Sequence, residues 1–87
     1  MDGLAIARRA KEALAEQTGF RPERVVGVAK NDTGWHVSVD VLELRRIPDS
    51  ADVLATYLVD LDEEGNVVGY HRARRYLRGQ VGEDGAA

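Results

Sequence analysis

The sequence predicts an α+β domain in which one N-terminal helix packs on a four-stranded antiparallel meander sheet. Three features support this prediction: an amphipathic stretch at the N-terminus, later runs in which apolar and polar residues alternate, and short clusters of turn residues between those runs. Short turns join antiparallel neighbours, and one helix can bury one face of such a sheet. A chain of 87 residues forms a single domain, which we expect over residues 1–79, followed by a flexible tail over residues 80–87.

The composition excludes several classes of function. The chain has no cysteine, which rules out disulfides, thiolate metal sites and cysteine nucleophiles. The formal net charge of −3 gives no general attraction to nucleic acid. No apolar run reaches the roughly 20 residues of a membrane-spanning helix, and the N-terminus does not follow the pattern of a signal peptide. We therefore expect a cytoplasmic protein without membrane contact.

Residues 3–18 are predicted to form the helix. The apolar positions that recur at helical spacing are Ile6, Ala10, Ala13 and Leu14. Asp2 is the expected N-cap, and Gly19 is expected to end the helix because glycine adopts the left-handed conformation at little cost.

The first two strands are predicted to form a hairpin. Residues 24–30 are expected to form the first strand, with Val26 and Val28 on one face, and residues 31–34 form a turn cluster. The second strand shows the clearest alternation, carried by Trp35, Val37, Val39 and Val41. The phase then slips by one residue at Leu42, which predicts a β-bulge.

The third and fourth strands are predicted to form a second hairpin. Pro48 and Asp49 end the second strand, because proline donates no ladder hydrogen bond and aspartate favours turns. Residues 53–61 are apolar on both faces, which predicts a central strand covered on both sides or a strand in an oligomer interface. Residues 62–66 form a turn, and residue 67 to about residue 78 form the fourth strand.

Arginines of the second and fourth strands are the strongest candidates for contact with a partner. Arginine and tyrosine are enriched at the energetic centres of protein interfaces. The residues predicted for protein contact are Arg45, Arg46, Tyr70, Arg72, Arg74, Arg75 and Tyr76. Of these, Tyr70, Arg72, Arg74 and Tyr76 are expected to share one face of the fourth strand.

Two alternatives stay open for the same arginines. They could form internal ion pairs with Asp49, Asp52 or Glu43, or they could contact RNA through stacking and phosphate binding. The negative net charge and the lack of an aromatic RNA-binding signature argue against nucleic acid.

The remaining polar residues predict no catalytic centre. His36 and His71 lack the spacing of metal ligands. The acidic turn at residues 60–66 lacks the pattern of a calcium-binding loop. No phosphate loop or nucleophile motif is present in the sequence. We therefore predict no catalytic, cofactor-binding or metal-binding residue, and we do not expect an enzyme.

A long motif covers residues 34–79, which is about half of the chain. It begins with Gly34-Trp35, continues with E-L-x-R-I-P-D at residues 43–49 and D-V-L-A-x-Y at residues 52–57, and closes with G-Y-x-R-x-R-R-Y at residues 69–76. In this motif the chain resembles the O-type gas vesicle synthesis proteins (GvpO). The motif positions to which we assign a structural role are Trp35, Pro48, Asp49, Asp52 and Tyr57.

The resemblance implies a cytoplasmic accessory protein that is needed for gas vesicle formation. Such a protein would bind other gas vesicle proteins, either shell or accessory, and could stay associated with the vesicle. The resemblance supplies no catalytic residue and no cofactor. A nucleic-acid-binding regulator of gas vesicle gene expression is the alternative. An edge strand could also pair with its copy, so a homodimer is a further expectation.

Overall fold

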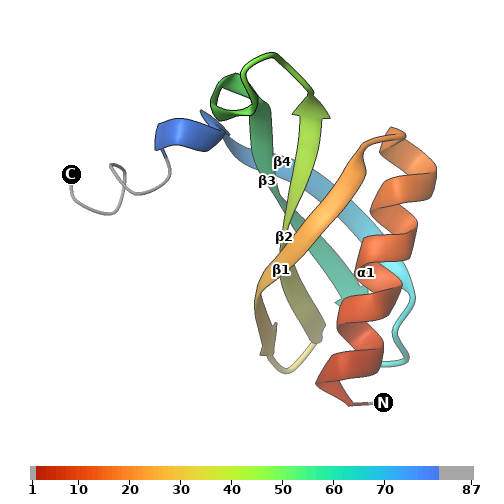
Figure 1. Cartoon of the computed structure of the whole chain (residues 1–87). Coiled ribbons are helices and arrows are strands. Elements are labelled where there is room, and N and C mark those ends of the chain that lie inside the picture. Colours follow the sequence, from red (N-terminus) through yellow and green to blue (C-terminus); the bar gives the residue numbers. More distant parts are fainter. Residues whose placement is uncertain (1, 81–87) are drawn as a thin grey trace.

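The chain folds into one helix and one four-stranded sheet, as Figure 1 shows for the computed structural model, which describes residues 2–80. Its elements are α1 (Gly3–Thr18), β1 (Arg21–Lys30), β2 (Gly34–Leu44), the 3-10 helix η1 (Asp49–Ala51), β3 (Val53–Asp62), β4 (Val67–Leu77) and the 3-10 helix η2 (Arg78–Gln80). The sheet is antiparallel in the order β1-β2-β3-β4, and α1 packs on one of its faces. The predicted α+β meander is confirmed. Of the predicted tail, residues 81–87 lie outside the described residues.

Helix α1 begins and ends at the predicted residues. The carboxylate of Asp2 accepts a hydrogen bond from the backbone nitrogen of Ala5 at 2.9 Å, as an N-cap does. Gly19 has a φ of 77° and donates its backbone N–H to the carbonyl of Ala15. The buried stripe of the helix is Ile6, Ala10 and Leu14. These side chains cover the central strands of the sheet, so the helix supplies one wall of the core.

The core lies between α1 and the two central strands. Their buried residues on this face are Val37, Val39, Val41, Ala55, Tyr57, Val59 and Leu61. Register pairs such as Val37 with Val59 and Val39 with Tyr57 place these side chains side by side. Burying one valine fully contributes roughly 1.5–3 kcal/mol, so this face carries most of the apolar stabilisation. The opposite face has no helix over it in the described part of the chain.

Strand β1 differs from the prediction in its start and in its phase. It begins at Arg21 rather than at residue 24. A register shift lies between Val25 and Gly27, and Val25 pairs with Val39 in the core face while Val26 is 55% exposed. The prediction that Val26 and Val28 share one face is therefore wrong, because the extra residue reverses the alternation.

A second irregularity changes the predicted face of β4. The register shifts between the pairs Thr56–Arg74 and Tyr57–Arg72, which leaves one extra residue between the two arginines. Arg72 therefore lies on the helix side of the sheet with Tyr57, whereas Arg74 lies on the open face with Thr56. The expectation that Tyr70, Arg72, Arg74 and Tyr76 share one face is wrong for this reason.

The two ends of the sheet are built differently. At one end, the side chains of Asn31 and Asp62 accept hydrogen bonds from the backbone of their own turns. The other end, which we call the loop end, holds the connection from β2 to β3, the start of β1 and the end of β4. The predicted bulge lies there, between Leu42 and Leu44. β3 is flanked by β2 and β4, so its central position is confirmed. Its predicted coverage on both sides is not seen, because within residues 2–80 the one α-helix packs on one face of the sheet.

Candidate protein-interaction surface

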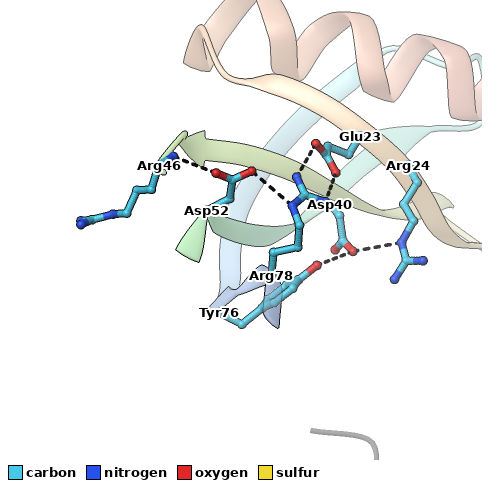
Figure 2. Close-up of polar contacts among 7 residues, drawn as sticks. All are labelled: Glu23, Arg24, Asp40, Arg46, Asp52, Tyr76 and Arg78. Atoms are coloured by element: carbon cyan, nitrogen blue, oxygen red, sulfur yellow. Dashed lines mark hydrogen bonds and ion pairs between the residues drawn. The ribbon is translucent and has the colours of Figure 1, made fainter. Parts of the chain in front are cut away.

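Asp52 ties the loop end together, as Figure 2 shows. One oxygen of its carboxylate accepts a hydrogen bond from the backbone nitrogen of Arg46 at 2.7 Å, and the other accepts from Nε of Arg78 at 3.2 Å. The guanidinium of Arg78 also donates to both carboxylate oxygens of Glu23, at 3.2 and 2.8 Å. The start of β1, the β2–β3 connection and the end of β4 are therefore linked through two carboxylates and one arginine.

This network keeps its charges fixed. The backbone N–H of Arg46 holds the pKa of Asp52 below its usual 3.8, and Arg78 acts in the same direction. Glu23, followed by Asp52, raises the pKa of Arg78. The Asp52 side chain is only 5% exposed, so its charge stabilises the fold through Arg46 and Arg78 and is not available to a partner.

A second buried carboxylate, Asp40, lies on the open face of the sheet (Figure 2). It accepts hydrogen bonds from the hydroxyl of Thr56 at 2.6 Å, the hydroxyl of Tyr76 at 2.7 Å and Nε of Arg24 at 3.3 Å. Burial and the bond to Asp40 raise the pKa of Tyr76 to about 12. The guanidinium carbon of Arg74 lies 4.6 Å from the centre of the Tyr76 ring, within the range of a cation–π contact. Asp40 thus fixes β4 to the centre of the sheet.

A third carboxylate, Glu43, is paired on the helix side. Its side chain is 4% exposed and receives Arg75 at 2.9 Å and Arg72 at 3.3 Å. Burial, and then the proximity of Glu43, raise the pKa of Tyr57. Glu43 follows Val39 and Val41 in the same phase of β2, so its side chain lies on the helix side of the sheet without help from the bulge. Two of the arginines predicted for protein contact, Arg72 and Arg75, thus form internal ion pairs. Their side chains nevertheless remain 46% and 56% exposed, respectively.

The structure separates the residues predicted for protein contact into three groups. Arg72 and Arg75 flank Glu43, and Tyr70 lies on the same side with its ring 6.1 Å from that of Tyr57. Arg74 and Tyr76 lie on the open face. The third group is Arg45 and Arg46 at the loop end. Within residues 2–80, neither guanidinium of this third group lies in an ion pair.

The motif residues with a predicted structural role also separate. Asp52 and Tyr57 are buried, and Trp35 is half-buried with the Lys30 ammonium 5.5 Å from its ring. Pro48 and Asp49 are exposed, and the carbonyl of Asp49 accepts the backbone N–H of Asp52 in the turn at 2.9 Å. The motif therefore builds the core and the loop end rather than one continuous patch.

An apolar hollow of about 370 Å³ opens at the loop end. It is lined by Leu44, Arg46, Val53, Arg75, Tyr76 and Leu77. We call these residues, together with Ile47, the loop-end patch. Leu44 is 45% exposed, Leu77 is 37% exposed and Ile47 is 99% exposed, so this patch presents apolar side chains to solvent beside two arginines. The four aliphatic residues were not predicted as contact residues, and the one local signal for them is Ile47 itself, an apolar side chain in a polar turn.

Both ring nitrogens of His36 contact neighbouring side chains. Nδ1 of His36 lies 2.7 Å from Asp60, and its Nε2 lies 2.6 Å from Nδ2 of Asn31. The Asn31 side-chain oxygen already accepts the backbone N–H groups of Thr33 and Gly34. Its nitrogen must therefore donate to Nε2, which leaves Nδ1 to carry the proton toward Asp60. His36 is held as a structural link between two strands.

Neither a metal cluster nor a membrane span is found among residues 2–80. No group of three or more histidine, aspartate and glutamate side chains in this range could hold a metal ion. In the same range, no helix is both long and apolar enough to cross a bilayer.

Comparison with known proteins places the chain in a family. A sequence profile described as Gas vesicle synthesis protein GvpO matches residues 2–82. Gas vesicle protein O of a Streptomyces strain is 44% identical over 77 residues, covering 88% of this chain and 60% of that protein. Gas vesicle protein O1 of Halobacterium salinarum is 36% identical over 76 residues, with coverages of 87% and 64%. Gas vesicle protein O of Haloferax mediterranei is 36% identical over 84 residues, with coverages of 94% and 60%.

These relatives are longer, since the chain spans 60% to 64% of their length. No solved structure matches the chain. The profile nevertheless covers nearly all of the sequence, and the predicted resemblance is confirmed. The chain belongs to the gas vesicle synthesis protein GvpO family.

Proposed function

We propose that this chain acts in gas vesicle formation as an accessory protein that binds other gas vesicle proteins, and that the loop-end patch is its contact surface. Membership of the GvpO family supports the role in gas vesicle formation. The exposure of Leu44, Ile47 and Leu77 supports the loop-end patch as the contact surface. Apolar side chains that gather on a surface and are bordered by arginine are typical of protein interfaces.

Binding is favoured over catalysis by the state of the buried carboxylates. Asp40, Glu43 and Asp52 each accept hydrogen bonds or ion pairs from neighbouring side chains or backbone. A general acid or base needs a polar atom within hydrogen-bond reach of a substrate. These three carboxylates have fold-stabilising partners instead, so they support a scaffold for an interaction surface.

The residues predicted for contact divide within this proposal. Arg46, Arg75 and Tyr76 belong to the loop-end patch. Arg45 lies next to it in the same connection. Arg72 belongs to the ion-pair network that positions Arg75 through Glu43. We therefore place the energetic centre of the interface at the end of the sheet rather than along the length of β4.

The test is co-purification of the chain with each other protein of a gas vesicle gene cluster, one at a time. At least one protein is expected to co-purify with the wild-type chain and to be lost when Leu44→Asp places a charge in the patch. Val68→Asp is the matched control, because Val68 is 69% exposed and lies near the start of β4, at the opposite end of the sheet from the loop-end patch. Circular dichroism checks that both variants are folded. Recovery of no protein at all contradicts the proposed binding, and equal recovery with both variants contradicts the proposed surface.

A cytoplasmic location and a homodimer also remain proposals. Light scattering of the chain alone tests the second. A mass of one chain at high concentration would contradict the homodimer and leave the patch available for a different protein.

A further inference from the structure

We infer that the partner segment which docks on the loop-end patch is acidic and apolar: carboxylate side chains flank an aliphatic side chain that enters the hollow. This inference rests on the proposed function, since it specifies the chemistry of the partner at the same surface. It follows from three observations on that surface.

The first observation is the apolar floor. Leu44, Val53 and Leu77 meet where the end of β2 pairs with the start of β3, and β3 pairs with the end of β4. The hollow of about 370 Å³ has room for an aliphatic side chain, and no residue of α1 lines it. Apolar area of this kind gains free energy when a partner removes it from water.

The second observation is the state of the two arginines at its border. Figure 2 shows the side chain of Arg46 extended away from Asp52, which it contacts only through its backbone nitrogen. Arg75 contacts Glu43 through Nε at 2.9 Å, and its two terminal nitrogens make no hydrogen bond to the described residues. Guanidinium groups in this state can donate two parallel hydrogen bonds to the carboxylate of a partner. This ion pair becomes stronger once the partner excludes water from the hollow.

The third observation separates a protein segment from a nucleic acid. Single-stranded nucleic acid needs open aromatic faces for base stacking and a groove with a positive excess. In the patch, the one aromatic ring is that of Tyr76, and the guanidinium of Arg74 already lies 4.6 Å from its centre. Glu43 and Asp52 pair with Arg75 and Arg78, so the loop end lacks the continuous positive excess that a phosphate backbone needs, whereas a segment with one or two carboxylates needs only the guanidinium groups at the border of the hollow. These features favour a carboxylate on an apolar segment over a phosphate backbone.

The probe is a short acetylated and amidated peptide, ELLEELLE, and its counterpart KLLKKLLK. Nuclear magnetic resonance of the ¹⁵N-labelled chain follows the backbone amides at ~50 mM salt, where phosphate contacts are also strong. The acidic peptide is expected to shift the amides of Leu44, Val53 and Leu77 and to bind at least about tenfold more tightly than the basic peptide. Arg46→Glu is expected to lower the affinity for the acidic peptide by at least about tenfold. Arg8→Glu, which changes an exposed arginine of α1, is the charge-matched control and should leave binding unchanged.

Four outcomes overturn the inference. They are equal binding of the two peptides, shifts that lie away from the patch, binding of a single-stranded RNA without binding of the acidic peptide, and self-association of the chain that Arg46→Glu abolishes. The result also stays separable from the proposed function. Acidic-peptide binding without any gas vesicle partner contradicts the proposed function alone, whereas a co-purified partner that is insensitive to Arg46→Glu contradicts the inference alone.

Discussion

The hydroxyl of Tyr76 provides the sharpest test of how the sheet is held together. Replacing Tyr76 by Phe removes one oxygen and keeps the ring in its buried position. The oxygen donates to Asp40 at 2.7 Å, and Asp40 is 3% exposed. A carboxylate this deeply buried cannot replace a lost donor by water without opening the sheet.

The expected loss follows from the partners that remain. A hydrogen bond to a charged group contributes about 1.5–3 kcal/mol. Asp40 keeps Thr56 and Arg24 in the variant, so we expect a loss near the lower part of that range, about 2 kcal/mol. A domain of this size is stable by roughly 4–13 kcal/mol. The melting temperature should therefore fall by roughly 10 °C.

Urea unfolding and thermal unfolding by circular dichroism measure this loss. Tyr70→Phe is the matched control, because it makes the same chemical change in the same strand and no hydrogen bond of the Tyr70 hydroxyl is found within residues 2–80. If the free energies of unfolding of the two variants agree within about 0.5 kcal/mol, the bond to Asp40 does not hold the sheet and the reasoning is refuted.

The same bond predicts a signature at alkaline pH. Because the folded-state pKa of Tyr76 is raised from 10.0 to about 12, its contribution is complete below pH 10. Above that pH the unfolded chain loses the proton first, and the free energy of unfolding falls by up to about 1.4 kcal/mol per pH unit until about pH 12. Tyr76→Phe should make this alkaline decline shallower. An identical decline in the wild type and the variant would show that Tyr76 does not cause it.

Three further predictions concern other parts of the fold. Asp52→Asn should reduce the free energy of unfolding at neutral pH and make its decline at acidic pH shallower. The reason is that the lowered pKa of Asp52 contributes stability above the unfolded-state pKa of 3.8, and this stability is lost as the pH falls through the folded-state pKa. An acid decline that is the same in wild type and variant contradicts this. Gly34→Ala should cost about 3 kcal/mol, because its Cβ would overlap the backbone oxygen of Leu61, whereas Gly27→Ala has nothing within 4 Å and serves as the control; similar unfolding midpoints refute the clash. Neutral His36 should carry its proton on Nδ1, and ¹⁵N resonances typical of the Nε2–H form would refute the hydrogen-bond assignment.

Local signals in the sequence were sufficient for the helix, the turns and one bulge. Asp2 and Gly19 act on backbone groups within a few residues, so their roles do not depend on the rest of the fold. The phase slip at Leu42 is also visible in a single strand, because apolar residues change face there. These elements could be predicted because their cause lies in neighbouring residues.

The bulges in β1 and β4 could not be predicted in the same way. Their position is set by the strand across the ladder: Val25 is held by Val39, and Arg72 is held by Tyr57. In β1 the adjacent Val25 and Val26 are compatible with either face, and Gly27 fits a bulge or an edge strand equally well. In β4 the alternating arginines show no change of apolar phase. The extra residue in β1 places Val26 at the surface. The extra residue in β4 places Arg72 and Arg74 on opposite faces of the sheet.

The candidate surface depended on the same long-range pairing. The arginines could be named from the sequence, but the residues that neutralise them could not all be found. Glu43 was among the expected ion-pair partners, whereas the pairing of Arg78 with Glu23 joins residues 55 positions apart. The hollow likewise requires Leu44 and Leu77, which come together only after three strands have paired in register.

The most direct test of the central claim is restoration of gas vesicles in cells whose own GvpO-family gene has been deleted. The chain, Leu44→Asp and Val68→Asp are expressed to equal levels, and vesicles are counted by electron microscopy. The proposed role predicts that the unchanged chain and Val68→Asp restore vesicles and that Leu44→Asp does not. Full restoration by Leu44→Asp would contradict the claim that the loop-end patch makes the contact on which gas vesicle formation depends.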